Sequence, residues 1–409
     1  MTETYLVGGA VRDHLLNRPV KDRDWVVVGS TAEKMIQQGY QQVGADFPVF
    51  LHPDTREEYA LARTERKTKA GYHGFVVDAS ASVTLEQDLA RRDLTINAIA
   101  QAEDGTLIDP LNGLDDLRKK RLRHASPAFS EDPVRILRVA RFAARFAHLG
   151  FQVAEDTMAL MIDMVDSGEV DALVPERVFA ELRSALTEPD PQCFIQVLRQ
   201  CGALARILPE VDALYGVPQT EKYHPEVDTG IHLELCLKQA ALLETNDLIR
   251  FCVLCHDLGK ALTPAKTLPS HHGHELAGVK PTKALCERLK VPSNWKQLAL
   301  LVTEFHTHTH RVRELKASTL MKLFKRLDIT RKPERANYLS IVGTIDARGR
   351  LGHEEARYPQ AEFLQNAAEA YLAINVQSIV AGCEEPSQIR AAIDGARLEA
   401  LRQFKRAQQ

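Results

Sequence analysis

The sequence predicts an α+β protein in which a small head with a mixed sheet is followed by an all-helical neck, body and tail. Two observations support this prediction. Short apolar strand candidates separated by turn residues are confined to residues 5–120. From about residue 130 onward, Leu, Ala, Arg and Glu dominate, and apolar residues recur at intervals of three and four, which is the helical period.

The length and composition indicate how many compact units the chain can form. A chain of 409 residues is long enough for two to four such units, and a hydrophobic fraction of 44% is enough to form their cores. We expect the head to span residues 1–125 and the neck to span 126–215. The body is expected at 228–330 and the tail at 331–409.

The head is expected to be built on short strands with helical windows between them. The strand candidates are residues 5–7, 24–28, 49–51 and 58–61. Turn-forming glycines follow the first two candidates, at Gly8-Gly9 and at Gly29. Strands that alternate with helices over this length indicate a small α/β or α+β unit.

The rest of the chain is expected to be helical. Helices of the neck are predicted at residues 131–147, 156–166, 175–187 and 190–202. Proline and glycine residues between 209 and 218 mark a break, and a second helical block follows. Nine of the fifteen histidines lie between His224 and His310, which makes this block a candidate site.

The composition argues against several protein classes. No apolar run approaches the length of about eighteen residues that a membrane span needs, and we expect no secretory signal at the start of the chain. Seven scattered cysteines are an odd number, which is typical of reduced thiols in the cytoplasm. The net charge is −3 and the pI is about 6.6, so an RNA-binding surface would need basic residues concentrated locally.

A first candidate site combines a glycine turn with paired aspartates. Gly8 and Gly9 follow a strand and open a helix, where backbone N–H groups can approach a phosphate. Asp22 and Asp24 are two residues apart on an extended segment, so their carboxylates can share one or two Mg²⁺ ions with a triphosphate. The aspartates alone are more often a solvated turn, but the glycines upstream favour the functional interpretation.

A second candidate site begins with Arg91, Arg92 and Asp93, which are consecutive. An arginine fork suits triphosphate oxygens, and a carboxylate can accept hydrogen bonds from ribose hydroxyls. From these residues alone, an ion pair at the start of a helix is slightly favoured. The functional interpretation depends on what lies nearby in the fold.

Asp132 and Arg135 are three residues apart, on one face of a helix that we expect Ser130 to cap. An acceptor beside a donor fork can imitate a base-pairing edge that fits cytosine and adenine but not guanine or uracil. The basic stripe continues through Arg138, Arg141 and Arg145. A salt bridge with a solvated basic face is the alternative, and the residues alone favour it.

A third candidate site lies in the histidine-rich block. His256 and Asp257 are adjacent near the end of an apolar helix, where both can contact one metal ion. Further nitrogen donors are His232, His271, His272, His274, His306, His308 and His310. Such ligands suit Zn, Ni, Mn or Fe. A metal bound there can activate a water molecule for attack on a phosphate ester. Histidines that only pack are the alternative, and Cys252 and Cys255 are interpreted as core residues of the helix.

The strand, glycine turn, helix and Asp-x-Asp strand together resemble the nucleotidyltransferase superfamily that includes DNA polymerase β. The segment from Tyr5 to Asp13 is similar to that of bacterial class II CCA-adding enzymes, which are tRNA nucleotidyltransferases. The resemblance implies a DNA polymerase β-like head in which Asp22 and Asp24 are catalytic and bind Mg²⁺.

The same resemblance assigns roles to the residues that contact the nucleotide. The implied nucleotide-binding residues are Gly9, Arg12, Arg92, Asp132, Arg135, Arg138 and Arg141. Asp93 is the implied ribose partner. Asp132 and Arg135 are implied to act as a protein template that selects CTP and then ATP, without a nucleic-acid template.

The order of His232, His256-Asp257 and His274 resembles the HD phosphohydrolase domain. This resemblance implies a body of HD type in which His256 and Asp257 are catalytic. It also implies that the four residues hold a transition metal, Ni²⁺ or similar. Asp346 is a candidate for a final carboxylate ligand, and the His306-Thr307 pair stands where some relatives have His-Asp.

From Tyr5 to about Arg350, the motifs resemble those of the bifunctional CCA-adding proteins of gamma-proteobacteria. The resemblance implies a cytoplasmic enzyme that adds and repairs the 3′-terminal CCA of tRNA with CTP and ATP. It also implies 2′,3′-cyclic phosphodiesterase, 2′-nucleotidase and phosphatase activities in the HD domain. Three alternatives stay open: a poly(A) polymerase of the same family, an HD phosphohydrolase with an inactive head, and a non-catalytic tRNA-binding protein. The sequence leaves the oligomeric state open.

Overall fold

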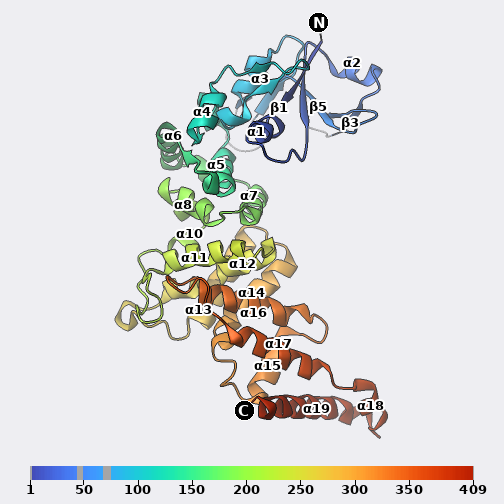
Figure 1. Cartoon of the computed structure of the whole chain (residues 1–409), viewed down its shortest axis with the longest axis vertical. Helices are drawn as coiled ribbons and strands as arrows, with labels where there is room; N and C mark the ends of the chain where they lie inside the picture. Colours follow the sequence, from blue (N-terminus) through green and yellow to red (C-terminus); the bar gives the residue numbers. More distant parts are fainter. Residues whose placement is uncertain (1, 44–48, 68–74, 409) are drawn as a thin grey trace. The chain divides into compact units, whose positions relative to one another are not determined.

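The structure is a computed structural model that describes residues 2–43, 49–67 and 75–408 (Figure 1). It divides into two compact units, Met1–Ile207 and Leu208–Gln409. The first unit contains the predicted head and the predicted neck up to Ile207, and the second contains the last eight residues of that neck, 208–215, with the predicted body and tail. The finer boundaries within each unit stay predictions.

A seven-stranded mixed sheet forms the head, with the strand order β3-β4-β5-β2-β1-β8-β9. The strands are β1 (Glu3–Val7), β2 (Asp24–Val28), β3 (Gln41–Val43), β4 (Val49–Leu51), β5 (Glu58–Leu61), β8 (Ala100–Gln101) and β9 (Leu107–Ile108). β2 and β5 run parallel, and the other neighbours are antiparallel. Val7 pairs with Asp24, so the first residue of β2 lies beside the end of β1 and the glycine turn that follows it.

Both faces of the head sheet are covered, because successive side chains of a strand point to opposite faces. Val26 of β2 packs in one core cluster together with Val7 and Leu89, and Val27 packs in another with Phe50. The helices of the head are α1 (Gly9–Leu15), α2 (Ala32–Gln37), α3 (Leu85–Ala90) and α4 (Gly113–Lys119). Two small ladders pair β6 (Thr64–Lys67) with β7 (Phe75–Asp78), and β10 (Arg121–Leu122) with β11 (Gln152–Val153).

The neck is helical, as expected, but its first helix begins later than predicted. Its helices are α5 (Val134–Phe146), α6 (Glu155–Asp166), α7 (Pro175–Thr187), α8 (Gln192–Gln200) and α9 (Ala203–Ile207). Asp132 is extended, with φ −125° and ψ 107°, because the residue before a proline is disfavoured in the helical region. The expectation that Ser130 caps α5 is wrong, because α5 begins only after Pro133. Ser126 instead caps a 3₁₀ turn, η2 (Pro127–Glu131), by accepting a hydrogen bond from the N–H of Ala128.

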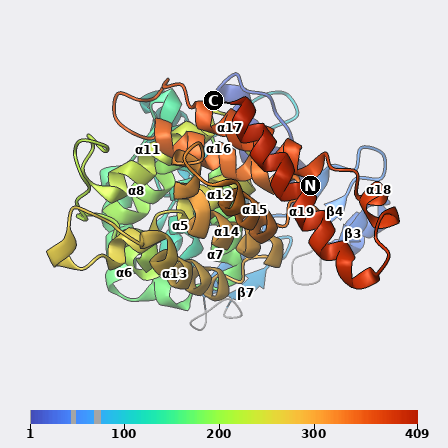
Figure 2. The same cartoon turned by 90° about the horizontal axis from the view of Figure 1, so that it is seen from below.

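The second unit is built from helices over its described residues, 208–408, apart from one isolated bridge between Pro218 and Asp228. The helices are α10 (Pro209–Asp212), α11 (Thr229–Leu242), α12 (Asp247–Cys255), α13 (His274–Arg288), α14 (Ser293–His310), α15 (Ala317–Leu327), α16 (Glu334–Arg348), α17 (Pro359–Leu372), α18 (Val376–Ala381) and α19 (Pro386–Ala407). α12 contacts α11, α14 and α16, and α19 lies alongside α15 and α17 (Figure 2). The central position of α12 explains why its side chains from Ile249 to Cys255 are buried.

The cysteines behave as expected for reduced thiols. No disulfide joins any of the seven, and Cys252 and Cys255 are buried in α12, so their spacing reflects core packing. Burial raises the pKa of both thiols, which keeps them protonated. Within the part of the chain that the structure describes, no helix combines the length and apolarity needed to cross a bilayer.

Candidate functional site

The first unit contains a strongly basic pocket of about 530 Å³. Nine arginines line it: Arg12, Arg63, Arg91, Arg92, Arg135, Arg138, Arg141, Arg145 and Arg177. Its acidic lining residues are Asp24, Asp93 and Asp132. This excess of guanidinium groups concentrates positive charge in a chain whose net charge is −3, and such a cavity attracts a polyanion such as a triphosphate.

The glycine turn forms one wall of this pocket. Gly8 has φ 71° and ψ −132°, a conformation that essentially only glycine adopts, and it directly precedes α1. A Cβ atom at Gly8 would lie 3.1 Å from Nη1 of Arg92, and one at Gly9 would lie 3.4 Å from Nη2 of Arg12. The turn therefore brings backbone close to two guanidinium groups.

The two predicted metal-binding aspartates lie at the start of β2. Asp24 is the first residue of the strand and lines the pocket, and Asp22 precedes the strand; both residues are exposed. Burial raises the pKa of Asp24, the charge of Arg92 lowers it, and the charge of Asp22 raises it, with a net rise. The two carboxylates therefore repel one another. A divalent cation that binds both of them through oxygen atoms would relieve that repulsion.

Asp93 anchors a buried hydrogen-bond network behind the pocket. Its Oδ1 accepts hydrogen bonds from the N–H of Leu94 at 2.8 Å and from Nδ2 of Asn97 at 2.9 Å. Its Oδ2 accepts one from Nε of Arg138 at 2.7 Å. Burial opposes the charge of Asp93, but Arg138 and these hydrogen bonds outweigh it and hold the pKa well below its ordinary value. Asp93 therefore stays ionised and orients Arg138.

Other arginines of the pocket are held by carboxylates in the same way. Arg141 pairs with Glu181 of α7 at 2.7 Å. Asp13 pairs with both Arg12 and Arg145, each at 2.8 Å. Side chains fixed in this manner lose little further freedom when they bind phosphate oxygens, so the pocket is preorganised.

Asp132 and Arg135 both line the pocket, but each has a separate partner. Arg177 of α7 donates to Oδ2 of Asp132 at 2.7 Å. Arg135 donates to the carbonyl oxygens of Ala128 at 2.6 Å and Arg91 at 2.7 Å. Sequence reasoning missed Arg177, because it lies 45 residues after Asp132 and no local pattern joins the two.

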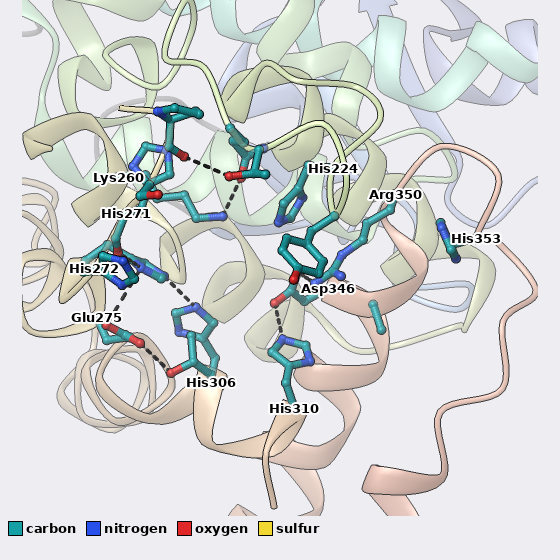
Figure 3. Close-up of a pocket in the computed structure, with 18 of the residues that line it drawn as sticks. His224, Lys260, His271, His272, Glu275, His306, His310, Asp346, Arg350 and His353 are labelled. Atoms are coloured by element: carbon teal, nitrogen blue, oxygen red, sulfur yellow. Dashed lines mark hydrogen bonds and ion pairs between the residues drawn. The ribbon is translucent and has the colours of Figure 1, made fainter. Parts of the chain in front are cut away.

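The second unit contains a pocket of about 670 Å³ among the predicted histidines (Figure 3). His274 begins α13, His306 and His310 lie on α14, and Asp346 lies on α16. Figure 3 shows His310 and Asp346 pointing toward one another, and the Nε2 of His310 lies 2.7 Å from Oδ2 of Asp346. Lys260 and Arg350 add positive charge to the lining, which suits a phosphate ester.

Asp257 is the centre of the histidine cluster. The Nε2 atoms of His256 and His274 each lie 3.3 Å from its carboxylate, and that of His232 lies 3.8 Å away. Burial opposes its charge, but His256 and Lys260 hold the pKa of Asp257 well below its ordinary value. The four residues named from the sequence are therefore brought together by the end of α12 and the two helices around it.

The structure adds two residues whose roles were open. His306 lies with its Nε2 3.4 Å from Oδ1 of Asp257, and Asp346 lies with Oδ1 3.1 Å from Nε2 of His232. His271 instead bonds the hydroxyl of Thr263 at 2.7 Å and the carbonyl oxygen of Pro218 at 3.0 Å. His271 is therefore held by protein partners on both ring nitrogens.

Comparisons with known proteins match domains in both units. Residues 4–123 match the poly(A) polymerase head domain, 150–215 the probable RNA- and SrmB-binding site of polymerase A, and 229–346 the HD domain. The chain is 57% identical over 403 residues to a protein of Thioalkalivibrio sulfidiphilus named multifunctional CCA protein, with 98% of each chain covered. It is 58% identical over 404 residues to a protein of that name from Laribacter hongkongensis, with 99% of each covered.

Solved structures share the fold. A CCA-adding enzyme of Bacillus stearothermophilus in complex with CTP is 21% identical, with a TM-score of 0.65 over 98% of this chain and 89% of that one. A Thermotoga maritima CCA-adding enzyme complexed with tRNA is 19% identical, with a TM-score of 0.63 over 100% of this chain and 92% of that one. The expected fold class, a nucleotidyltransferase head with a mixed sheet followed by a helical neck and HD body, is confirmed.

Proposed function

The chain belongs to the family of the multifunctional CCA proteins, and from this membership we propose that it builds and repairs the 3′ end of tRNA in one pocket and hydrolyses phosphate esters in another. CTP and ATP are the nucleotide substrates of the first pocket, and the tRNA 3′ end is the acceptor. Because the substrate is tRNA, we place the protein in the cytoplasm. Both activities depend on divalent metal ions.

The observation that carries the first activity is the arginine-lined pocket with Asp24 in its wall. The negatively charged oxygens of a nucleoside triphosphate would pair with these guanidinium groups. We assign Gly9, Arg12 and Arg92 to the nucleotide because all three line the pocket at the glycine turn. We assign Arg138 and Arg141 to the nucleotide as well, because carboxylates orient both of them inside the pocket.

We assign Asp22 and Asp24 as ligands of Mg²⁺. Their mutual repulsion and oxygen donors suit that hard ion. When bound, Mg²⁺ lowers the charge of the triphosphate and favours ionisation of the tRNA 3′-hydroxyl. Asp93 keeps Arg138 in place, and we assign Asp93 to the ribose because it lines the pocket.

We assign the choice of base to Asp132 and Arg135. The carboxylate of Asp132 can accept a hydrogen bond from the exocyclic amino group of cytosine or adenine, and Arg135 supplies donors for the neighbouring ring positions. The two carbonyl bonds that Arg135 makes fix its guanidinium in the pocket wall. Arg177 holds Asp132 while no base is bound, and the base must share or replace that contact.

We assign His232, His256, Asp257 and His274 to a transition metal, Ni²⁺ or similar. The Nε2 of His256 has no hydrogen-bond partner among the described residues, and the buried carboxylate of Asp257 faces imidazole groups and the ammonium of Lys260, which lies 2.6 Å from Oδ2. Imidazole and carboxylate donors of this kind fit a metal ion. When bound, the metal activates water for attack on phosphorus. Lys260 and Arg350 can bind the phosphate oxygens of a 2′,3′-cyclic phosphate or a 2′-phosphate.

Nucleotide addition is tested with a tRNA that lacks its terminal CCA. With Mg²⁺ and CTP alone, we expect addition of cytidines that stops before adenosine, and with ATP added later we expect the CCA end to be completed. Long adenosine runs with ATP alone would instead indicate a poly(A) polymerase. An absence of any incorporation would contradict the proposal for the first pocket.

Hydrolysis is tested with a 2′,3′-cyclic nucleotide and with a 2′-nucleotide. We strip the protein of metal with a chelator and add Ni²⁺, Co²⁺, Mn²⁺, Zn²⁺ or Mg²⁺ separately. We expect turnover with at least one transition metal and little with Mg²⁺, because imidazole ligands favour softer ions. If no metal restores turnover of either substrate, the second pocket does not have the proposed activity.

A further inference from the structure

We propose that Gln219 contacts the substrate in the second pocket, where its amide N–H groups donate to a non-bridging oxygen of the phosphate ester beside Lys260. This inference deepens the proposed hydrolase function and rests on it. It adds a substrate-binding residue from the loop between α10 and α11, outside the histidine cluster.

The amide group of Gln219 is buried and has an unused donor. Gln219 is 3% exposed and lines the second pocket. Its Oε1 accepts a hydrogen bond from Nζ of Lys260 at 2.6 Å. Because an ammonium group can only donate, this contact fixes which amide atom faces Lys260. The Nε2 of Gln219 has no hydrogen-bond partner among the described residues, and a buried donor that stays unpaired is unfavourable.

The loop that carries Gln219 is held at two points. The backbone N–H of Gln219 donates to the carbonyl oxygen of Val227 at 2.7 Å. The Nε2 of His271 lies 3.0 Å from the carbonyl oxygen of Pro218, which directly precedes Gln219. The unused donor is therefore placed in the pocket wall before a ligand binds, and binding needs little further ordering of the loop.

Lys260 supplies a second donor at the same place. Among the described residues its Nζ contacts Oδ2 of Asp257 and Oε1 of Gln219, each at 2.6 Å. A lysine ammonium has three N–H donors, so at least one is left for a ligand. Since Nε2 and Oε1 belong to the same amide group, the free donors of Gln219 and Lys260 lie close together.

The ligand atom that suits these donors is an oxygen with negative charge. Arg350 lines the same pocket and adds a guanidinium group to the lysine and the amide. Hydrogen bonds from such groups to an anionic oxygen are stronger than those to a neutral ribose hydroxyl. A 2′,3′-cyclic phosphate and a 2′-phosphate both carry non-bridging oxygens of this kind, so the contact serves both substrates of the proposed hydrolase.

A purely orienting role is the alternative, in which Gln219 only holds Lys260 in place. The substitution Gln219→Glu separates the two roles. Glutamate keeps an oxygen acceptor for Lys260, but it replaces the unused donor with a second acceptor oxygen that repels phosphate. An orienting role would survive this substitution, because an ammonium group bonds a carboxylate at least as well as an amide oxygen.

The first measurement is hydrolysis of a 2′,3′-cyclic nucleotide by the full-length protein, loaded with the transition metal that supports turnover. Gln219→Glu should lower kcat/KM by at least about tenfold and raise the inhibition constant of inorganic phosphate by a similar factor. It should keep the metal content of the original protein in plasma mass spectrometry, which shows that the pocket is still folded.

Gln297→Glu is the matched control. The Oε1 of Gln297 accepts a hydrogen bond from Nη2 of Arg335 at 3.2 Å, so this glutamine also faces a cation in the second unit, but it does not line the pocket. The control should hydrolyse the cyclic nucleotide at the original rate and show the original inhibition by phosphate.

A second measurement leaves the pocket unaltered. Side-chain amide resonances of the original protein, carrying isotope-labelled glutamine, are recorded by NMR after loading with diamagnetic Zn²⁺ and again with added inorganic phosphate. The resonance that is missing from Gln219→Met identifies Gln219, and it should shift when phosphate is added, whereas the resonance of Gln297 should not. The proposal is overturned if Gln219→Glu keeps the original kcat/KM, or if the Gln219 resonance does not move with phosphate.

The contact and the hydrolase function fail in different ways. If no metal supports turnover by the original protein, the function is contradicted, and the response of the Gln219 resonance to phosphate still decides the contact. If the original protein hydrolyses the cyclic nucleotide and Gln219→Glu does so equally well, the function stands and the contact is contradicted.

Discussion

Replacing Asp93 with asparagine tests whether one buried carboxylate orients the arginine pocket. The substitution keeps the shape of the side chain and removes its charge. The amide oxygen can still accept from Leu94 and Asn97, so the loss is concentrated at Arg138, whose Nε lies 2.7 Å from Oδ2. We therefore expect a defined change in both stability and activity.

The expected magnitude follows from the exposure of the two partners. A hydrogen bond to a charged group contributes about 1.5–3 kcal/mol. The side chain of Asp93 is 6% exposed and that of Arg138 is 39% exposed, so water compensates part of the loss. We expect the free energy of unfolding to fall by about 1.5 kcal/mol, which corresponds to a melting temperature lower by about 3–6 °C for a unit of this size. A displaced Arg138 should lower kcat/KM for CTP by about 100-fold.

The pH dependence has a definite sign. The pKa of Asp93 is lowered in the folded protein, so its stabilising contribution is fully present above the unfolded value of about 3.9 and is lost as the pH falls through the folded value. The difference in unfolding free energy between the original protein and Asp93→Asn should therefore be constant from about pH 6 to 8. It should shrink only below about pH 4.

The assay combines urea unfolding with incorporation of CTP into a tRNA that lacks CCA. Asp115→Asn is the matched control, because it removes an exposed carboxylate that pairs with Lys119 on the surface of α4. The control should change stability less and leave CTP incorporation intact. The reasoning is refuted if Asp93→Asn is no less stable than the control and incorporates CTP at the original rate.

Three further predictions concern other parts of the first unit and the thiols. Asp132→Asn replaces one acceptor oxygen with a donor NH₂ group and should cost about 1–3 kcal/mol of transition-state binding. This lowers kcat/KM for CTP by roughly 5- to 150-fold in single-nucleotide incorporation with CTP and UTP in parallel. Incorporation of UTP should fall less, and an equal loss for both would show that Asp132 does not select the base. In Gly8→Ala, alanine must adopt the positive φ of Gly8, which costs about 1–3 kcal/mol, and its Cβ would press against Arg92. CTP incorporation should therefore be lost. Gly105→Ala, also at positive φ but with nothing within 4 Å, should keep it, and equal activity of the two variants would refute the role of the turn. A thiol reagent should label at most two of the seven cysteines before denaturation, the half-buried Cys193 and Cys383, and labelling of more would contradict the observed burial.

Much of the fold could be predicted from the sequence where a pattern is local. The strand at residues 24–28 and the helix at 175–187 match β2 and α7, because a continuous apolar run and a helical period are visible within each. The strands β3, β8 and β9 were not predicted, since β3 begins with two glutamines and β8 and β9 have only two residues each. The start of α5 was misplaced because Pro133 keeps Asp132 out of the helix.

The candidate sites were predictable only in part. Asp24 and His256 are recognised from their own neighbours in the sequence. Arg177 reaches Asp132 from another helix, and Asp346 reaches His232 across 114 residues. Such contacts depend on how helices pack, and a single sequence carries no direct signal of that packing. Asp346 and His306 could be named as candidates, but only the fold shows what they contact.

The central claim is that one chain carries two separate sites, and exchanging one residue in each tests it most directly. Full-length Asp22→Ala and His256→Ala proteins are assayed side by side for CTP incorporation into tRNA and for hydrolysis of a 2′,3′-cyclic nucleotide. We predict that Asp22→Ala loses incorporation and keeps hydrolysis, and that His256→Ala does the reverse. If either substitution removes both activities from a folded protein, the two-site account is wrong.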